Sequence, residues 1–170
     1  MDSLFPDPDP PPESPPPPPR KRGSKVQPAA HDPALRPLAA ALPPSLHLGT
    51  SSWTYAGWVG TVWDQDYSDS MLSRHGLGAY VQHPLFRTVS LDRAFYRPLD
   101  VGQYATYAAQ VPADFRFVVK APSLVADAQI RDESGRGMQM NPRFLDPELA
   151  LRSFVEPATE GLGRKLGALV

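Results

Sequence analysis

Residues 87–120 decide the fold of this chain, and they read RTVSLDRAFYRPLDVGQYATYAAQVPADFRFVVK. Two segments rich in β-branched and aromatic residues, 87–91 and 115–120, are typical of strands. Between them, apolar and small residues recur at helical spacing from Asp100, a favoured N-cap, to Val111, just before a proline. This order of strand, helix and strand with short connections predicts a parallel βαβ unit with a right-handed crossover.

Similar signals lie on both sides of this unit. We predict a first strand over residues 46–50, a helix over residues 71–81 capped by Ser70, and the start of a fourth strand at residues 166–170. A further helix begins at Asp146, has a proline at its first position, and is expected to be interrupted at Pro157. Residues 123–145 show no sustained period and are expected to form a long loop.

The alternation predicts an α/β domain over residues 46–170, with about three and a half βα units. Two architectures agree with it. One is an open doubly wound sheet, and the other is a closed eight-stranded barrel, which as a rule needs ~250 residues.

Residues 1–45 differ in composition from the rest of the chain. They contain fifteen of the 22 prolines and a single aromatic residue, Phe5, so they can bury little apolar surface. We expect a disordered, proline-rich tail with polyproline II character. Its basic run at residues 20–25 has the charge to dock on nucleic acid or an acidic partner, and the alternative is a solvated linker.

The composition also excludes several classes of function. Without cysteine there is no disulfide framework, no thiolate metal site and no cysteine nucleophile. A net charge of -1 provides no whole-chain attraction to nucleic acid or an anionic membrane. No apolar run approaches the ~20 residues of a membrane span, and no signal peptide is recognisable, so we expect a soluble cytoplasmic protein. The four histidines are dispersed, which predicts no metal site, and no motif implies a cofactor.

Chemistry-bearing side chains gather where the predicted strands end, and parallel α/β folds bind their ligands at the carboxyl ends of strands. Asp92 suits a general base or a group that orients one, and Lys120 suits anion binding or use as an amine of shifted pKa. Arg97 can form a fork onto a carboxylate or phosphate. The candidate catalytic residues are Asp92 and Lys120, and the candidate ligand-binding residues are Ser51, Trp53, Tyr96 and Arg97.

A structural interpretation of the same residues carries about equal weight. In this structural interpretation, Asp92 and Lys120 form an internal ion pair, and such pairs can shift pKa values without having a functional role. Trp53 and Tyr96 are then packing residues. The two interpretations are separated by the effect of Asp92→Asn and Lys120→Met on ligand binding.

Three segments carry a resemblance to a known family. They are GTSSWTYAGWVG at residues 49–60, SLDRAFY at residues 90–96 and FRFVVK at residues 115–120. In order and spacing they resemble the motifs G-T-S-G-W-x-Y-x-x-W-x-G, E-I-N-S-T-F-Y and F-x-F-x-V-K of the YecE-like proteins, filed as domain of unknown function 72. The resemblance covers residues 46–170 and implies a TIM-barrel-like fold with a pocket at the carboxyl face of the strands. It implies no established activity.

This chain departs from the family pattern at three positions. Ser52 replaces a glycine, Ser90 stands where the family often has glutamate, and Asp92 replaces an asparagine. An acid–base role of that glutamate therefore does not carry over to Ser90. Asp92 offers a carboxylate only from a position two residues further along.

The family pattern continues past Val170, so we expect the chain to contain the first half of a TIM-barrel-like domain. A half barrel exposes the edges of its terminal strands, which predicts self-association. Two function hypotheses follow. The first is a protein that binds, and in one version hydrolyses, a small anionic or phosphate-containing ligand. The second is a non-catalytic interaction protein, or an inactive fragment, in which no reaction occurs.

Overall fold

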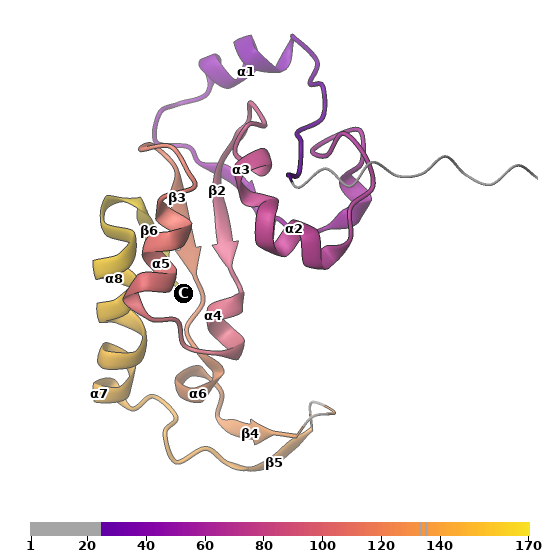
Figure 1. Cartoon of the computed structure of the whole chain (residues 1–170). Helices are drawn as coiled ribbons and strands as arrows, with labels where there is room; N and C mark the ends of the chain where they lie inside the picture. The colour runs from indigo at the N-terminus through magenta and orange to yellow at the C-terminus, as the bar shows by residue number, and fades with distance from the viewer. Residues whose placement is uncertain (1–24, 133, 135) are drawn as a thin grey trace, which may run out of the picture.

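A four-stranded parallel sheet lies at the centre of the computed structural model, which describes residues 25–132, 134 and 136–170. Its strands follow the order β1 (Leu48–Thr50), β2 (Phe86–Leu91), β3 (Arg116–Val119) and β6 (Leu166–Leu169). Each strand pairs in parallel with the one before it in this order (Figure 1). The predicted α/β class is thus confirmed. These four strands do not close a barrel, and the TIM-barrel-like architecture stays a prediction.

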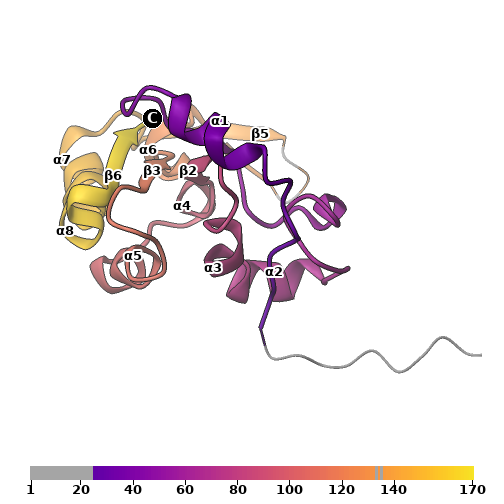
Figure 2. The same cartoon turned by 90° about the horizontal axis from the view of Figure 1, so that it is seen from above.

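One face of the sheet forms the hydrophobic core. Val89 and Leu91 of β2 and Phe117 and Val119 of β3 are fully buried, whereas the residues that alternate with them are half-buried. The helices α2, α3, α5 and α8 lie along the same side of the strands (Figure 2). The predicted alternation of the second strand, with an apolar and a polar face, is therefore confirmed.

The helical segment after β1 differs from the prediction. It consists of two short helices, α2 (Asp69–His75) and α3 (Leu77–Tyr80), preceded by the single 3-10 turn η1 (Ala56–Trp58). The N-cap is Ser68, whose Oγ accepts a hydrogen bond from the backbone N–H of Met71, and not Ser70 as predicted. The break falls at Gly76, where a Cβ would lie 2.5 Å from the carbonyl oxygen of Leu72. This close approach explains why a glycine stands between the helices.

Helix α5 (Val101–Ala108) confirms the prediction of a capped amphipathic helix, which ends before the predicted limit of Val111. Asp100 and Gln103 form a reciprocal capping box, in which the Asp100 carboxylate accepts from the Gln103 N–H at 2.8 Å. At the other end of the helix, the Lys165 ammonium donates to the carbonyl oxygens of Ala108 and Val111, both at 2.7 Å. A lysine at this end satisfies orphan carbonyls and complements the helix dipole.

The helix predicted to stop at Pro157 continues past it. It begins at Asp146, which caps α7 (Pro147–Ala150), runs through the π-helical turn η2 (Leu151–Val155), and continues as α8 (Glu156–Leu162). Pro157 has no N–H to donate, and the wider π turn in front of it accommodates this loss without ending the helix. The helix ends at Gly163, whose φ of 53° suits glycine, and the 3-10 turn η3 (Gly163–Lys165) leads into β6.

Residues 123–145, predicted to be a loop, contain regular elements. The short helix α6 (Ser123–Ala126) is followed by the antiparallel strands β4 (Gln129–Arg131) and β5 (Gly137–Met140). These elements and the short helix α4 (Arg93–Tyr96) lie beyond the carboxyl ends of β2 and β3 (Figure 1). The prediction failed here because strands of three and four residues are too short to show a period.

The boundary of the N-terminal tail also needs correction. Residues 25–45 include helix α1 (Leu35–Ala41), which lies over the amino-terminal end of the sheet (Figure 2). The side chains of Val26, Ala29 and Ala39 are buried, and the Ala29 N–H donates to the Val62 carbonyl oxygen at 2.9 Å. A tail reaching residue 45 is therefore wrong for residues 25–45. The proline-rich segment 6–19 and most of the basic run lie outside the described residues. Within the described part of the chain, no helix is long and apolar enough to cross a bilayer.

Candidate functional site

The ends of β2 and β3 bring the two predicted catalytic residues together. Leu91 and Val119 are paired in register, so the residues that follow them, Asp92 and Lys120, leave the sheet side by side. The Lys120 Nζ lies 3.4 Å from Oδ1 of Asp92, and the same oxygen accepts a hydrogen bond of 2.7 Å from the Ser90 hydroxyl. No described residue donates a hydrogen bond to the other carboxylate oxygen, Oδ2.

This ion pair is accessible from solvent. The side chains of Lys120 and Asp92 are 48% and 33% exposed. An exposed ion pair contributes little to stability, about 0–1 kcal/mol, because water screens it. Lys120 also retains N–H groups that Asp92 does not use, since an ammonium has three donors. The pair can therefore engage a ligand without a large loss of folding energy.

Helix α4 begins at Asp92 and adds two arginines to this edge of the sheet. Arg93 is its first residue and Arg97 its C-cap, and both are exposed. Neither side chain forms a hydrogen bond or an ion pair with another described residue. With Lys120, this makes three cations against the one carboxylate of Asp92 along the segments that leave β2 and β3.

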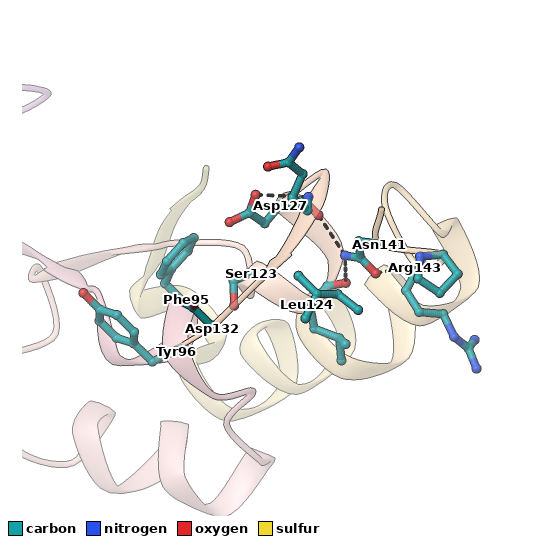
Figure 3. A pocket seen from close by; sticks show the side chains of 11 residues that line it. Phe95, Tyr96, Ser123, Leu124, Asp127, Asp132, Asn141 and Arg143 are labelled. Atoms are coloured by element: carbon teal, nitrogen blue, oxygen red, sulfur yellow. Dashed lines mark hydrogen bonds between the residues drawn. The ribbon is translucent and has the colours of Figure 1, made fainter. Parts of the chain in front are cut away.

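A pocket of about 620 Å³ opens beside α4, the helix that follows Asp92 (Figure 3). Its walls are α4, α6 and the β4–β5 hairpin. Tyr96 lies at its rim with 81% of its surface exposed, and its ring meets that of Phe95 edge-on at 5.4 Å. Other lining residues are Ser123, Leu124, Asp127, Gln129, Ile130, Asp132, Asn141, Pro142 and Arg143.

Asn141 holds one wall of this pocket in place. It is buried, and its amide nitrogen donates to the carbonyl oxygens of Leu124 and Asp127 at 2.9 and 2.8 Å (Figure 3). Its side-chain oxygen accepts from the Arg143 N–H at 2.9 Å. The side chain of Asn141, which directly follows β5, thus links the end of the β4–β5 hairpin to α6. Its hydrogen-bonding capacity is largely spent on the backbone, so we regard Asn141 as a residue that shapes the pocket.

The Arg143 guanidinium is directed away from the pocket interior. It lies on the far side of the backbone from Tyr96 (Figure 3), and one of its nitrogens is 3.3 Å from Oδ2 of Asp146. Asp146 in turn caps α7 by accepting from the Leu149 N–H at 3.0 Å. That hydrogen bond, followed by the effect of Arg143, lowers the pKa of Asp146. Arg143 is thereby engaged in local structure.

Of the two remaining predicted residues, Ser51 directly follows β1 at the carboxyl edge but lines a different pocket, and Trp53 is buried. Ser51 is exposed and lines a separate pocket of about 450 Å³ together with Tyr55 and Asp69. Trp53 is only 6% exposed, and its Nε1 donates to the Leu72 carbonyl oxygen at 3.2 Å. The structure therefore brings Asp92, Lys120, Tyr96 and Arg97 together beyond the ends of β2 and β3, whereas Ser51 and Trp53 belong to the loop after β1.

A buried tyrosine fixes the end of β1 from which the Ser51 loop departs. The Tyr80 hydroxyl accepts a hydrogen bond from the Thr50 N–H at 3.1 Å and donates to the Thr88 carbonyl oxygen at 3.2 Å. Burial raises the pKa of Tyr80, so the hydroxyl stays protonated and can donate. Tyr80 thus joins the carboxyl end of β1 to the middle of β2.

The described residues contain no set of side chains that could bind a metal ion. Within residues 25–132, 134 and 136–170, no three histidine, aspartate or glutamate side chains come together in a way that could hold a metal ion. Apart from the Asp92 carboxylate, the polar groups at the edge are an ammonium, guanidinium groups and hydroxyls. Such groups donate hydrogen bonds to anions.

The family of the chain follows from its match over residues 47–170 to the proteins described as "Protein of unknown function DUF72". The match spans most of the chain. The chain belongs to the DUF72 family. This confirms the resemblance of its three motifs to the YecE-like proteins. No curated protein matches the chain.

Two solved structures from this family, both of a DUF72 family protein from Enterococcus faecalis V583, are similar to the chain. The first is 20% identical with a TM-score of 0.47, and the match covers 71% of this chain and 36% of the other. The second is 24% identical with a TM-score of 0.41, and the match covers 58% and 35%. The chain thus spans just over a third of the length of these DUF72 proteins.

Sequence reasoning missed the second wall of the pocket. Leu124, Ile130 and Asn141 lie in the segment predicted to be a loop, where no period marked them. One signal was available. Asn141 is the only asparagine of the chain, and it directly precedes a proline at the end of this segment.

Proposed function

We propose that this DUF72 domain binds a small anionic ligand, such as a phosphate ester, at the carboxyl edge of its sheet. The observation that carries the proposal is the pair of Lys120 and Asp92, 3.4 Å apart and half-exposed at the ends of two adjacent strands. An ammonium held in this way is oriented by its partner but remains open to a second anion. Ligand sites of parallel α/β folds lie at this edge of the sheet.

The local charge supports an anion in preference to a cation. Arg93 and Arg97 have no partner within the described part of the chain, and Lys120 is balanced only by Asp92. An anion near α4 would gain attraction from these groups, and a guanidinium can offer two parallel N–H donors to a phosphate. Because the cluster is exposed, we expect modest affinity that weakens as salt is added.

Catalysis at the same edge is the more specific form of this proposal. Asp92 has one carboxylate oxygen that accepts from Ser90 and faces Lys120, while Oδ2 accepts from no described residue. A free carboxylate oxygen beside a bound phosphate ester is suited to accept a proton from an attacking water. Turnover that is lost in Asp92→Asn would make the domain a hydrolase. Saturable binding without turnover would favour a non-catalytic binding protein.

We further propose that the four strands are part of a TIM-barrel-like arrangement. Support comes from the sequential strand order, the one fully buried face of β2 and β3, and the motif resemblance to the YecE-like proteins. In such an arrangement Lys120 and Asp92 stand at the mouth of the barrel. That position is where barrels of this type bind substrates.

Calorimetric titration of the chain with inorganic phosphate and methyl phosphate tests the binding proposal. We expect saturable binding that falls at least tenfold in Lys120→Met. Lys25→Met is the matched control, because Lys25 is also an exposed lysine but lies before α1, away from this edge. If Asp92→Asn and Lys120→Met reduce only the stability and leave phosphate binding unchanged, the pair is structural and the proposal is wrong.

A further inference from the structure

The pocket near Lys120 indicates the chemical class of the uncharged part of the ligand. We infer that the ligand is an aryl phosphate, a molecule whose phosphate lies at Lys120 and whose flat aromatic group lies in the pocket between α4, α6 and the β4–β5 hairpin. This inference rests on the proposed function and deepens it. It concerns the uncharged part of the same ligand.

The lining of the pocket favours a flat apolar group. Tyr96 exposes 81% of its surface, and Leu124 and Ile130 on the facing elements are 45% and 49% exposed. Exposed apolar side chains that surround one hollow are a common mark of a binding site. The edge-on contact with Phe95 leaves Tyr96 free to offer a ring face to a ligand.

The pocket and the cation cluster are close enough for one small molecule. Asp92 is the N-cap of α4 and Tyr96 its last residue, so their Cα atoms are separated by four helical steps, ~6 Å along the axis. Ser123, on the opposite wall, follows Lys120 by three residues, which spans at most ~11 Å of extended chain. An aromatic phosphate ester has about this length.

The polar groups of the pocket set the direction in which the ligand binds. Asp127 and Asp132 place carboxylates on the hairpin side of the pocket, and ionised carboxylates cannot donate hydrogen bonds to an anion. Oδ1 of Asp132 already accepts hydrogen bonds from Ser134 and the Arg136 N–H. Arg143, the arginine that lines the pocket, is held by Asp146 at 3.3 Å, and Lys120, Arg93 and Arg97 lie at the other end, near the sheet. The phosphate is therefore directed to Lys120 and the uncharged ring to Tyr96.

The test compares two esters of equal charge, phenyl phosphate and methyl phosphate, in calorimetric titrations. We expect phenyl phosphate to bind at least fivefold more tightly to the unmodified chain. Tyr96→Ala removes this preference, and Tyr96→Phe keeps it, because the ring and not the hydroxyl contacts the ligand. Tyr55→Ala is the matched control, since Tyr55 is also an exposed tyrosine but lines the other pocket.

The outcomes separate this inference from the proposal beneath it. Equal affinity for the two esters, with both lost in Lys120→Met, would overturn the aryl ligand and leave the anion site standing. A preference for phenyl phosphate that survives Tyr96→Ala would overturn the assignment of the pocket. Binding of neither ester would overturn both proposals. Because Tyr96 is exposed, we expect the urea midpoint of Tyr96→Ala to match that of the unmodified chain, which excludes misfolding as the cause.

Discussion

Replacing Asn141 with leucine removes the link between α6 and the returning strand while keeping the side chain nearly the same size. Three hydrogen bonds are lost, to the carbonyl oxygens of Leu124 and Asp127 and from the Arg143 N–H. Each such bond contributes a net ~0.5–1.5 kcal/mol, and the freed backbone groups lie near the surface, where water can reach them. We therefore take a value near the lower end of the sum and expect the free energy of unfolding to fall by about 2 kcal/mol.

The assay is urea unfolding followed by tryptophan fluorescence. With a urea dependence of about 2 kcal/mol/M, the expected loss lowers the midpoint by about 1 M. Gln139→Leu is the control, because Gln139 is an exposed amide on the same hairpin with no side-chain hydrogen bond to another described residue. We expect that variant to unfold as the unmodified chain does. If Asn141→Leu and Gln139→Leu have the same midpoint, Asn141 does not hold the pocket wall and the reasoning is refuted.

Three further predictions concern other parts of the molecule. Lys165→Met removes two charged hydrogen bonds from the end of α5 and should lower the free energy of unfolding, measured in a urea melt, by about 2 kcal/mol. Arg164→Met, at the exposed neighbouring residue, should change it by less than about 0.5 kcal/mol. Burial lowers the pKa of His31 and of His83, whose rings meet edge-on at 4.7 Å. The free energy of unfolding should therefore be highest above the unfolded-state pKa of about 6.5 and should fall as the pH drops below it. This fall should be smaller in His31→Phe, and equal pH slopes in the two proteins would contradict the prediction. The outer edges of β1 and β6 pair with no described strand, so we expect self-association, seen as a urea midpoint that rises with protein concentration; a midpoint independent of concentration would refute this.

The parts of the fold that the sequence predicts well are those with strong local signals. Helix α5 has a capping box at Asp100 and a repeating apolar face, β2 alternates between apolar and polar residues, and β3 is rich in aromatic and β-branched residues. These patterns depend on neighbours along the chain, so they are visible without the structure. The sequence also predicts that β2 and β3 are parallel, and their pairing in the structure sets Asp92 beside Lys120.

The pocket could not be predicted because long-range contacts create it. Asn141 reaches back 17 residues to Leu124, and nothing in the local sequence indicates that contact. Trp53 shows the opposite problem. Its loop suggested ligand contact, but its indole packs edge-on against Tyr107 of α5, at 5.6 Å, and is buried. An aromatic residue in a loop does not reveal which helix will cover it.

The central claim is that Lys120 binds an anion, and the most direct test is an NMR titration of the lysine side chains with inorganic phosphate at constant ionic strength. The chain has four lysines, Lys21, Lys25, Lys120 and Lys165, so the signals can be assigned with one substitution each. We predict that the Lys120 signal shifts with a saturable dependence on phosphate while the other three stay in place. A Lys120 signal that does not move, or that moves in parallel with the others, would contradict the claim.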